Sequence, residues 1–344
     1  MHAALVTGLK QVELVEFPDP EASAGRAVVQ VAYCGICGTD LHAWLSGEPY
    51  NPAICGHEWC GDVSAVGAGV DHVREGDRVA IGVATACGHC ASCRRGDAAH
   101  CETAFAGMIG VGPLAAPHGG FAPAIAIDGS RLYRLDPAVD DATAAILEPA
   151  TVAVHAVRRT PLRLGDAVVV LGAGPIGLLT AACARVAGAG GVVVVEPQPE
   201  RRALASRLGA DRVIDPTAED AAEAVNDFFG QTGADVVFEC AGIPATINQS
   251  VALVRRGGVV SLVGVADKAA EIMPAQWLVQ EVRLVSSLGY LREEFSIAQD
   301  LAKDGRLDLG ALHTSTVGLD GIGDAFARLA EAPSEVKILV DPRR

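Results

Sequence analysis

Three glycines, Gly172, Gly174 and Gly177, form a G-x-G-x-x-G pattern between an apolar run at 166–171 and a stretch of helical character. The pattern alone is common. A strand, a glycine turn and a helix in this order predict a dinucleotide site, where the backbone approaches a pyrophosphate at a helix N-terminus. Glu196 ends the next apolar run, about 20 residues on, where a carboxylate binds ribose hydroxyls. We therefore expect a doubly wound α/β fold, the Rossmann fold, in this half of the chain.

The predicted cofactor site extends beyond the glycines. Pro175 and Ile176 lie inside the motif, and Arg201 follows Glu196 closely. The Glu196 carboxylate would accept hydrogen bonds from the ribose and repel a 2′-phosphate, which favours NAD over NADP. Arg201 and Arg202 keep NADP as the alternative, because an arginine at this point can hold a 2′-phosphate.

The length of 344 residues predicts more than one hydrophobic core. Near-continuous apolar strands alternate with helices over 151–288, which indicates a parallel sheet covered on both faces. Residues 1–150 show short strands between Gly, Pro and Asp clusters, the pattern of an all-β sandwich or barrel. The segment 289–344 mixes helices with a last strand. We expect strands at 27–32, 62–66, 78–83, 166–171, 192–195, 212–214, 236–240, 259–263 and 336–340, and helices at 200–208, 294–303 and 321–331.

Four cysteines, Cys87, Cys90, Cys93 and Cys101, follow the spacing C-x2-C-x2-C-x7-C. Four thiolates this close together match a tetrahedral zinc site in which every position is filled by protein. Such a closed site leaves no position for a substrate, so it is structural. We expect a zinc-held lobe at 87–101, and we expect the chemistry elsewhere.

The net charge of the chain limits which macromolecules or surfaces it could bind. Lys and Arg number 27 and Asp and Glu 42, so the formal net charge is −15. Nucleic acids and anionic membranes are themselves negative, and the chain lacks basic–aromatic interleaving. These features argue against a nucleic-acid-binding protein built on the cysteine cluster, and against a membrane partner.

Location is inferred from the cysteines and the N-terminus. No charged and apolar signal segment opens the chain, and ten cysteines in a chain of this length are expected to be reduced thiols in the cytoplasm. The uncharged stretch 167–184 has the length of a membrane span. Its glycines fit a strand, a turn and a helix better.

Three short segments carry residues that ligate metals: Cys34 and Cys37 at C-x2-C spacing, His57 with Glu58, and Glu148. A catalytic zinc takes about three protein ligands and keeps one position open. Cys37, His57 and an acidic residue could supply these ligands. Each has an ordinary alternative. Cys34 and Cys37 could be a redox pair or two buried cysteines, His57 and Glu58 a core histidine and a surface acid, and Glu148 a helix cap. Only their combination favours a metal site.

These segments resemble zinc-dependent medium-chain alcohol dehydrogenases. The matching pieces are CGICGTDLH, GHE, VREGDRVAIG, the four-cysteine segment, LEPATVAVHA and VVVLGAGPIGLL, in the family's order. The resemblance implies a GroES-like catalytic domain at 1–150 and 289–344 and a Rossmann domain at 151–288. Glu148 within LEPA is similar to the branch that acts on secondary alcohols and polyols, the sorbitol, butanediol and threonine dehydrogenases.

The resemblance implies an enzyme that transfers a hydride between a secondary alcohol, diol or polyol, or the matching ketone, and NAD(H). It implies two zinc ions per chain and a homodimer or homotetramer through the dinucleotide domains. Cys37 and His57 would ligate the catalytic zinc, and Glu58 and Glu148 compete for the third position. Asp40 would orient the ring of His57.

Three further roles follow from the same resemblance. Thr39 would take the proton of the substrate hydroxyl, His42 would pass it to solvent, and Lys337 would contact the cofactor pyrophosphate.

The competing hypothesis is a non-catalytic or zinc-free relative that binds a dinucleotide as a sensor or structural protein. No cluster of Arg or Lys is evident that would clamp an anionic substrate, which favours neutral alcohols or ketones. Candidate pocket walls are Trp44, Val83, Phe105, Met108, Val265, Leu288 and Tyr290.

Overall fold

The computed structural model describes residues 1–48, 51–112, 115–332 and 334–344. The chain divides into two compact units. Unit 1 comprises Met1–Glu148, Tyr290–Lys303 and Leu309–Arg344, and unit 2 comprises Pro149–Gly289 and Asp304–Asp308.

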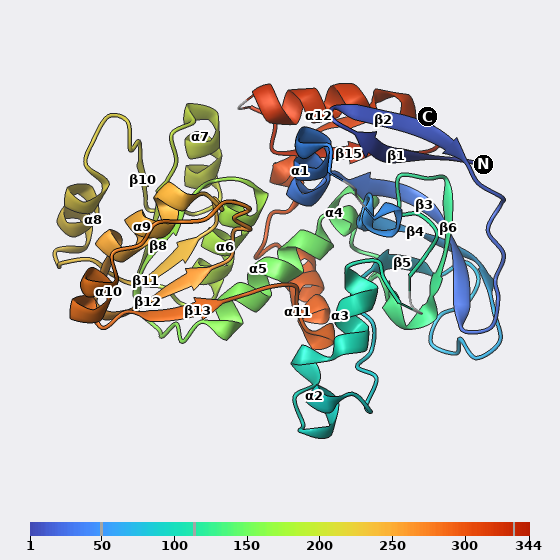
Figure 1. Cartoon of the computed structure of the whole chain (residues 1–344), viewed down its shortest axis with the longest axis horizontal. Helices are drawn as coiled ribbons and strands as arrows, with labels where there is room; N and C mark the ends of the chain where they lie inside the picture. The colour runs from blue at the N-terminus through green and yellow to red at the C-terminus, as the bar shows by residue number, and fades with distance from the viewer. Residues whose placement is uncertain (49–50, 113–114, 333) are drawn as a thin grey trace. The chain divides into compact units, whose positions relative to one another are not determined.

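Unit 2 contains a six-stranded parallel sheet in the order β10-β9-β8-β11-β12-β13 (Figure 1). The first strand, β8, lies in the middle and the order reverses beside it, as in the Rossmann fold. This confirms the predicted doubly wound sheet. The strands are β8 (Ala167–Leu171), β9 (Gly191–Val195), β10 (Arg212–Ile214), β11 (Ala234–Glu239), β12 (Val254–Leu262) and β13 (Arg283–Ser286).

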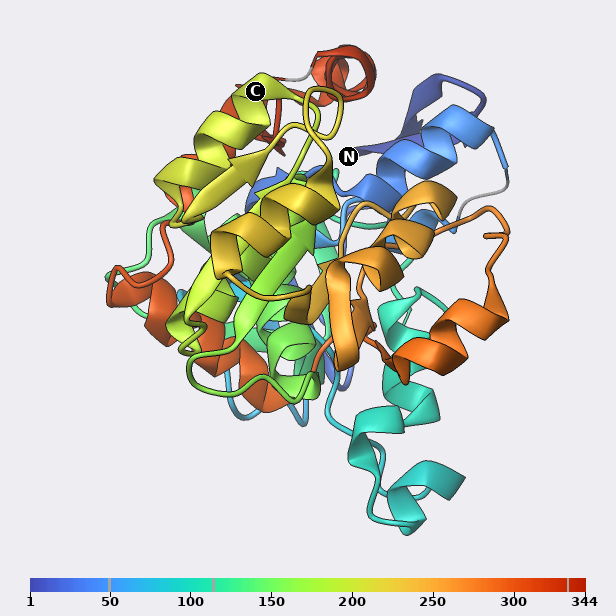
Figure 2. The same ribbon diagram turned by 90° about the vertical axis from the view of Figure 1, so that its left-hand side faces the viewer.

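Helices cover this sheet, which can be followed in Figures 1 and 2. The helix α6 contacts β8 and β9, and α9 contacts β11 and β12. All five residues of β8 and of β9 are buried, as expected for a parallel strand covered on both faces. The helices are α5 (Leu147–Arg159), which begins at the boundary of the units, α6 (Pro175–Val186), α7 (Pro199–Arg207), α8 (Ala221–Phe229), α9 (Pro244–Leu253) and α10 (Pro274–Gln280).

Two glycines of the motif are required by the turn from β8 to α6. Gly172 has φ +93°, a left-handed conformation, and a Cβ there would also approach Ala241. A Cβ on Gly177 would lie 2.0 Å from the carbonyl oxygen of Gly172. The turn therefore closes tightly only because both side chains are absent. Pro175 opens α6 at a position where its missing N–H costs nothing.

Unit 1 is built on a seven-stranded sheet in the order β14-β15-β3-β4-β5-β7, with β6 also paired to β3, and a separate hairpin of β1 and β2. The long antiparallel pair of β3 and β4 is its centre, and its register runs from Ala27 opposite Val66 to Gly35 opposite Glu58. The strands are β1 (His2–Gly8), β2 (Gln11–Glu16), β3 (Arg26–Gly35), β4 (Glu58–Val66), β5 (Arg78–Ile81), β6 (Ala124–Asp128), β7 (Leu132–Arg134), β14 (His313–Val317) and β15 (Lys337–Val340).

Short helices connect these strands, and the segment with α2 and α3 projects away from the sheet of its own unit in both views (Figures 1 and 2). The α-helices are α1 (Gly38–Ser46), α2 (Ala91–Arg94), α3 (Glu102–Met108), α4 (Asp141–Ala145), α11 (Arg292–Lys303) and α12 (Ile322–Glu331). The 3-10 helices are η1 (Pro52–Ile54), η2 (Ala98–His100), η3 (Gly129–Arg131), η4 (Gly310–Leu312) and η5 (Leu319–Gly321).

Each unit has its own hydrophobic core. In unit 1, Val29, Trp59 and Phe326 belong to one cluster, and in unit 2 the inward residues of β8, β9 and β11 form another. The stretch 167–184, which has the length of a membrane span, is a strand, a turn and part of α6. Across the described ranges, no helix is both long and apolar enough to cross a membrane.

Candidate functional site

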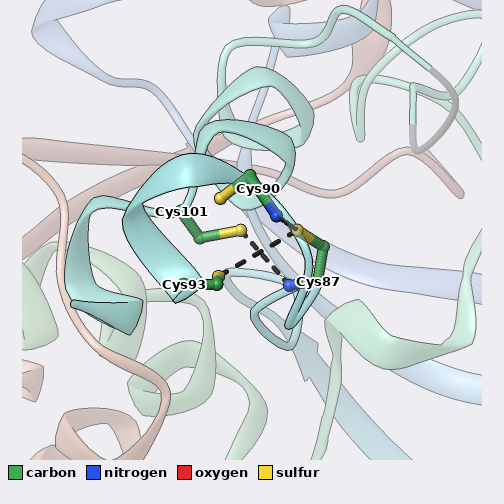
Figure 3. A group of neighbouring side chains, drawn as sticks. All are labelled: Cys87, Cys90, Cys93 and Cys101. Atoms are coloured by element: carbon green, nitrogen blue, oxygen red, sulfur yellow. Dashed lines mark hydrogen bonds between the residues drawn. The ribbon is translucent and has the colours of Figure 1, made fainter. Parts of the chain in front are cut away.

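The four predicted cysteine ligands come together in the segment that contains α2 and η2. Their sulfur atoms all lie within 4.8 Å of one another, and Figure 3 shows them gathered inside the loop. Cys90 precedes α2 and Cys101 precedes α3, while Cys87 and Cys93 complete the group. Backbone N–H groups point at the sulfurs, with Cys87 N donating to Cys101 Sγ at 3.2 Å and Cys90 N donating to Cys87 Sγ at 3.3 Å.

This geometry fits a zinc ion. The Cys87 and Cys93 sulfurs are 4.0 Å apart, against about 3.8 Å for a tetrahedral ion with bonds of about 2.3 Å. A hydrogen bond from the His89 backbone lowers the pKa of Cys87 to about 5, whereas burial raises the pKa of Cys93 to about 12. Four thiolates this close repel one another, and a bound cation is what allows them to be charged together.

A second group of ligand atoms joins Cys37, His57 and Glu58, again within 4.8 Å of one another. Cys37 caps the start of α1 just after β3, and Glu58 begins β4, the partner of β3. The pairing of Gly35 with Glu58 brings the two segments side by side. A Cβ on Gly35 would lie 2.4 Å from Glu58 Oε2, so the absence of a side chain at 35 gives this carboxylate its place.

The orientation of His57 differs from the prediction that Asp40 would hold its ring. His57 Nδ1 pairs with the carbonyl oxygen of Ile54 at 2.9 Å, which leaves Nε2 for a metal. The buried Asp40 carboxylate instead accepts hydrogen bonds from Cys37 N at 3.0 Å and Gly56 N at 3.2 Å. Asp40 therefore fixes the backbone that carries the two ligands.

Glu148, the other candidate for the third ligand, lies outside the group of three. It is nevertheless close enough to His57, Glu58 and Lys337 to interact with their charges, and burial raises the pKa of Glu148 to about 7. Tyr290, expected only as a pocket wall, lies beside it and interacts with the Glu148 carboxyl through its hydroxyl. Burial lowers the pKa of His57, but the neighbouring negative groups outweigh this and hold it well above its usual value.

Lys337, expected to contact a pyrophosphate, is 1% exposed, and its ammonium is engaged within the protein. It donates to Glu58 Oε2 at 2.6 Å and to the carbonyl oxygen of Ile36 at 2.9 Å. These two bonds use two of the three N–H donors of the ammonium, and the pyrophosphate contact stays a prediction. What Lys337 does here is hold the Glu58 carboxylate.

The two residues of the predicted proton relay lie on α1 and are exposed. Thr39 Oγ1 is 3.7 Å from the sulfur of Cys37, and His42 is on the next turn of the helix. Trp44, a candidate pocket wall on the same helix, is 5% exposed and stacks on Phe326 of α12 at 5.6 Å. It therefore belongs to the core of unit 1.

In unit 2, Glu196 follows β9 and bridges two backbone segments. Its Oε2 accepts from Ala173 N, inside the glycine turn, at 2.7 Å, and its Oε1 accepts from Gln198 N at 2.9 Å. The two arginines that follow Glu196 both interact within the protein. Arg202 donates to the Glu196 carbonyl at 2.8 Å and pairs with Asp215 at 2.9 Å, while Arg201 is half-buried beside it.

A three-ligand metal group on a β-rich unit and a glycine turn on a Rossmann unit define a metal-dependent dehydrogenase as the class of protein. The family models agree. Residues 23–137 match the alcohol dehydrogenase GroES-like domain, and residues 175–304 match the zinc-binding dehydrogenase domain.

Curated relatives cover the whole chain. It is 33% identical to (R,R)-butanediol dehydrogenase of Bacillus subtilis, over 99% of this chain and 100% of the relative. It is 34% identical to 2-dehydro-3-deoxy-L-galactonate 5-dehydrogenase of Pseudoalteromonas atlantica, over 99% and 98%.

Solved structures agree with these relatives. The crystal structure of the Bacillus subtilis 2R,3R-butanediol dehydrogenase covers 99% of this chain and 99% of that one, with a TM-score of 0.86 and 32% identity. A putative zinc-binding dehydrogenase of Sinorhizobium meliloti bound to NADP has the same TM-score and coverage, with 31% identity. The chain belongs to the zinc-dependent medium-chain alcohol dehydrogenase family, and it is an oxidoreductase that acts on CH–OH groups.

Proposed function

We propose that unit 1 is the catalytic domain, unit 2 binds the dinucleotide, and the enzyme transfers a hydride between a secondary alcohol, diol or polyol and NAD(H). The observation that carries this proposal is the group of Cys37, His57 and Glu58, whose ligand atoms lie within 4.8 Å of one another. One thiolate, one imidazole and one carboxylate suit zinc. A zinc ion held there would act as a Lewis acid and lower the pKa of a substrate hydroxyl.

Residues of the chain support this site. Lys337 donates a hydrogen bond to Glu58, and the missing side chain at Gly35 leaves room for the Glu58 carboxylate. The carbonyl oxygen of Ile54 pairs with the ring of His57. The Asp40 carboxylate accepts a hydrogen bond from the backbone N–H of Cys37. We assign the third ligand position to Glu58, because Glu148 is outside the group. Burial raises the pKa of Glu148 to about 7, so we propose that its carboxyl exchanges a proton near neutral pH. Exposed Thr39 and His42 are proposed to pass the hydroxyl proton to solvent.

We infer that NAD is the preferred cofactor. The buried Glu196 carboxylate stands at the end of β9, where it would bind ribose hydroxyls and repel a 2′-phosphate. Arg202 is already engaged by Glu196 and Asp215, which removes one of the two arginines that could bind that phosphate. The bound nicotinamide would supply the hydride chemistry that side chains lack.

We also propose two zinc ions per chain, a homodimer or homotetramer, and a cytoplasmic location. The two ligand groups support the zinc count. The free state of all ten cysteines agrees with a reducing compartment. The strand β13 ends the unit 2 sheet and exposes Leu284, and Leu278 and Val279 are exposed on α10, so an apolar edge is available to a second copy.

The function is tested by a screen of secondary alcohols, diols and polyols with NAD and NADP, combined with metal analysis. We expect about two zinc ions per chain, turnover with NAD, and loss of turnover in Cys37→Ser with the fold retained by circular dichroism. Cys34→Ser is the matched control, because this buried cysteine is three residues away in β3 and outside the ligand group. Turnover retained by Cys37→Ser would refute the ligand assignment.

A further inference from the structure

Two Lys or Arg side chains are buried within the described part of the chain, Lys337 and Arg131. Lys337 is neutralised by the Glu58 carboxylate at 2.6 Å. Arg131 is 6% exposed and forms no ion pair with any described carboxylate. Exposed arginines such as Arg212 and Arg256 do have acidic partners. Because burying a charge without a partner is costly, the buried guanidinium of Arg131 requires an explanation.

The backbone and Nε of Arg131 are fixed by Gly82, which follows β5. Nε donates to the Gly82 carbonyl oxygen at 3.2 Å, and Gly82 N donates back to the Arg131 carbonyl oxygen at 2.9 Å. The two terminal nitrogens have no hydrogen-bond partner among the described residues. The two terminal nitrogens are unpartnered but not fully buried, so each of them has some surface that a ligand can reach. Four N–H donors are therefore held ready for a ligand.

The surroundings of the guanidinium connect it to the candidate metal centre. Burial lowers the pKa of Arg131, and the charges that oppose this are, in order, those of Tyr290 and Glu148. Glu148 in turn interacts most strongly with His57. Within unit 1, Arg131 therefore interacts with Glu148 and Tyr290, and Glu148 interacts with the candidate metal ligand His57.

Asp128 and Tyr133 also lie near Arg131, but the hydrogen bonds of both groups go to residues other than Arg131. Asp128 Oδ1 accepts from Ser130 N at 2.9 Å and from Ser130 Oγ at 2.6 Å. Tyr133 donates its hydroxyl to the Val83 carbonyl oxygen at 3.0 Å. Neither forms a bond with the terminal nitrogens, so the donors of Arg131 are left for a group from outside the protein.

We propose that Arg131 binds a carboxylate of the substrate, so that the enzyme acts on hydroxy acids such as sugar acids rather than on neutral polyols alone. This rests on the proposed function. The secondary hydroxyl would lie at Cys37, His57 and Glu58, lose a hydride to NAD and a proton to solvent, and become the ketone of a keto acid. A guanidinium has the planar fork that matches a carboxylate with two parallel hydrogen bonds. This proposal revises the expectation of a neutral substrate, which rested on the lack of an evident Arg or Lys cluster. One buried arginine is enough to bind a single carboxylate.

The first experiment uses the wild-type zinc enzyme. Six-carbon alditols are compared with the aldonates of the same configuration, such as glucitol with gluconate and galactitol with galactonate, and glucitol 6-phosphate is the phosphate arm. We expect kcat/KM for the preferred aldonate to exceed that of its alditol by about tenfold or more. A preference for the phosphate ester over both would assign Arg131 to a phosphate and overturn the carboxylate.

The second experiment changes Arg131. Arg131→Met should lower kcat/KM for the aldonate by about 10- to 100-fold, mainly through KM, because the carboxylate is remote from the reacting carbon. The alditol should be little affected. Arg131→Lys should recover part of the loss, because it keeps the charge without the fork. Arg134→Met is the matched control. Arg134 is exposed, lies three residues on and pairs with Asp77, and its replacement should leave the aldonate preference unchanged.

Several results would overturn the inference. One is an equal loss for alditol and aldonate in Arg131→Met, since Arg131 would then act through Glu148. Another is a higher kcat/KM of the wild-type enzyme for alditols than for aldonates. This comparison does not depend on whether the Arg131 variant folds. Calorimetric binding of aldonates to the zinc protein separates the two proposals. Arg131-dependent binding without any turnover refutes the proposed function alone, whereas turnover of alditols without aldonate binding refutes the carboxylate site alone.

Discussion

Single residues in the candidate metal centre are held by contacts across the length of the chain. Glu58 and Lys337 are 279 positions apart, yet their carboxylate and ammonium meet at 2.6 Å with side chains 1% and 2% exposed. Burial lowers the pKa of Lys337, but the Glu58 charge outweighs this and the net shift is upward. Lys337 therefore stays charged at neutral pH beside the Glu58 carboxylate.

Lys337→Met should destabilise unit 1 strongly, because it leaves the Glu58 carboxylate buried without its partner. Removing one member of a buried pair costs about 3–5 kcal/mol. The free energy of unfolding, measured by urea with tryptophan fluorescence, should fall by that order. Adding Glu58→Gln should recover part of the loss. A double variant that is as unstable as the sum of the single variants would contradict the coupling.

His118 provides a pH-dependent contribution to stability away from the metal ligands. It is 1% exposed, its Nδ1 pairs with the Gly119 carbonyl oxygen at 2.8 Å, and burial lowers its pKa below the usual 6.5. The unfolded chain then binds the proton more readily than the folded one. The stabilisation is therefore complete above pH 6.5 and is lost as the pH falls towards the folded pKa.

His118→Gln should accordingly flatten the fall in unfolding free energy between about pH 7.5 and about pH 5.5. The measurement is urea unfolding at several pH values across this range. His72→Gln is the control, because His72 is an exposed histidine of the same unit and should leave the slope unchanged. An identical slope in His118→Gln and wild type would show that His118 does not titrate on unfolding.

Part of the site could be predicted from sequence because its residues carry local patterns. The cysteine spacing and the glycine turn are short-range features, and the structure brings each set together. The inward position of Lys337 and the bond from His57 to Ile54 could not be predicted in this way, because they depend on which strands pair. Arg131 carries no sequence signal at all, since only its burial without a carboxylate distinguishes it.

At the scale of elements, the strands were easier to predict where they are buried on both faces. Apolar runs predicted strands at 166–171 and 192–195, and the structure has β8 and β9 there. In unit 1, the strand β6 has a mixed burial pattern, and η3 follows it directly. Such short edge elements take their conformation from their neighbours, so the sequence alone did not predict them.

The segment 87–108, which contains α2 and α3, should depend on zinc, because Cys101 is the only buried hydrophobic residue that the structure describes there. Its helices α2 and α3 are four and seven residues long, too short to be stable alone in water. Cys93→Ser should lower the zinc content from about two to about one per chain and make 87–101 sensitive to proteases. Metal analysis and limited proteolysis measure both effects.

The control for this prediction is Cys183→Ser in α6, which changes a buried cysteine of unit 2 outside both ligand groups. It should keep both zinc ions and leave the protease sensitivity of 87–101 unchanged. If Cys93→Ser retained two zinc ions and a resistant segment, the closed structural site would be wrong.

At the scale of the whole molecule, the two units divide the proposed work. Unit 1 carries both groups of metal ligands, and unit 2 carries the glycine turn and Glu196. Unit 2 also exposes apolar residues at or near its open sheet edge, with Leu278 77% and Leu284 49% exposed. With a net charge of −15, chains should repel one another at long range, so association would depend on such an apolar edge.

Leu284→Lys should therefore convert the proposed oligomer to a smaller species. The strand β13 ends the sheet, and its outer backbone groups are available to pair with the same strand of a second copy. A lysine at 284 would place two like charges against each other across the two-fold axis of such a pair. Sedimentation velocity measures the effect. Leu164→Lys is the matched control, because Leu164 is 88% exposed in the same unit but precedes β8, away from β13. A monomeric wild type, or equal dissociation in both variants, would contradict assembly through β13.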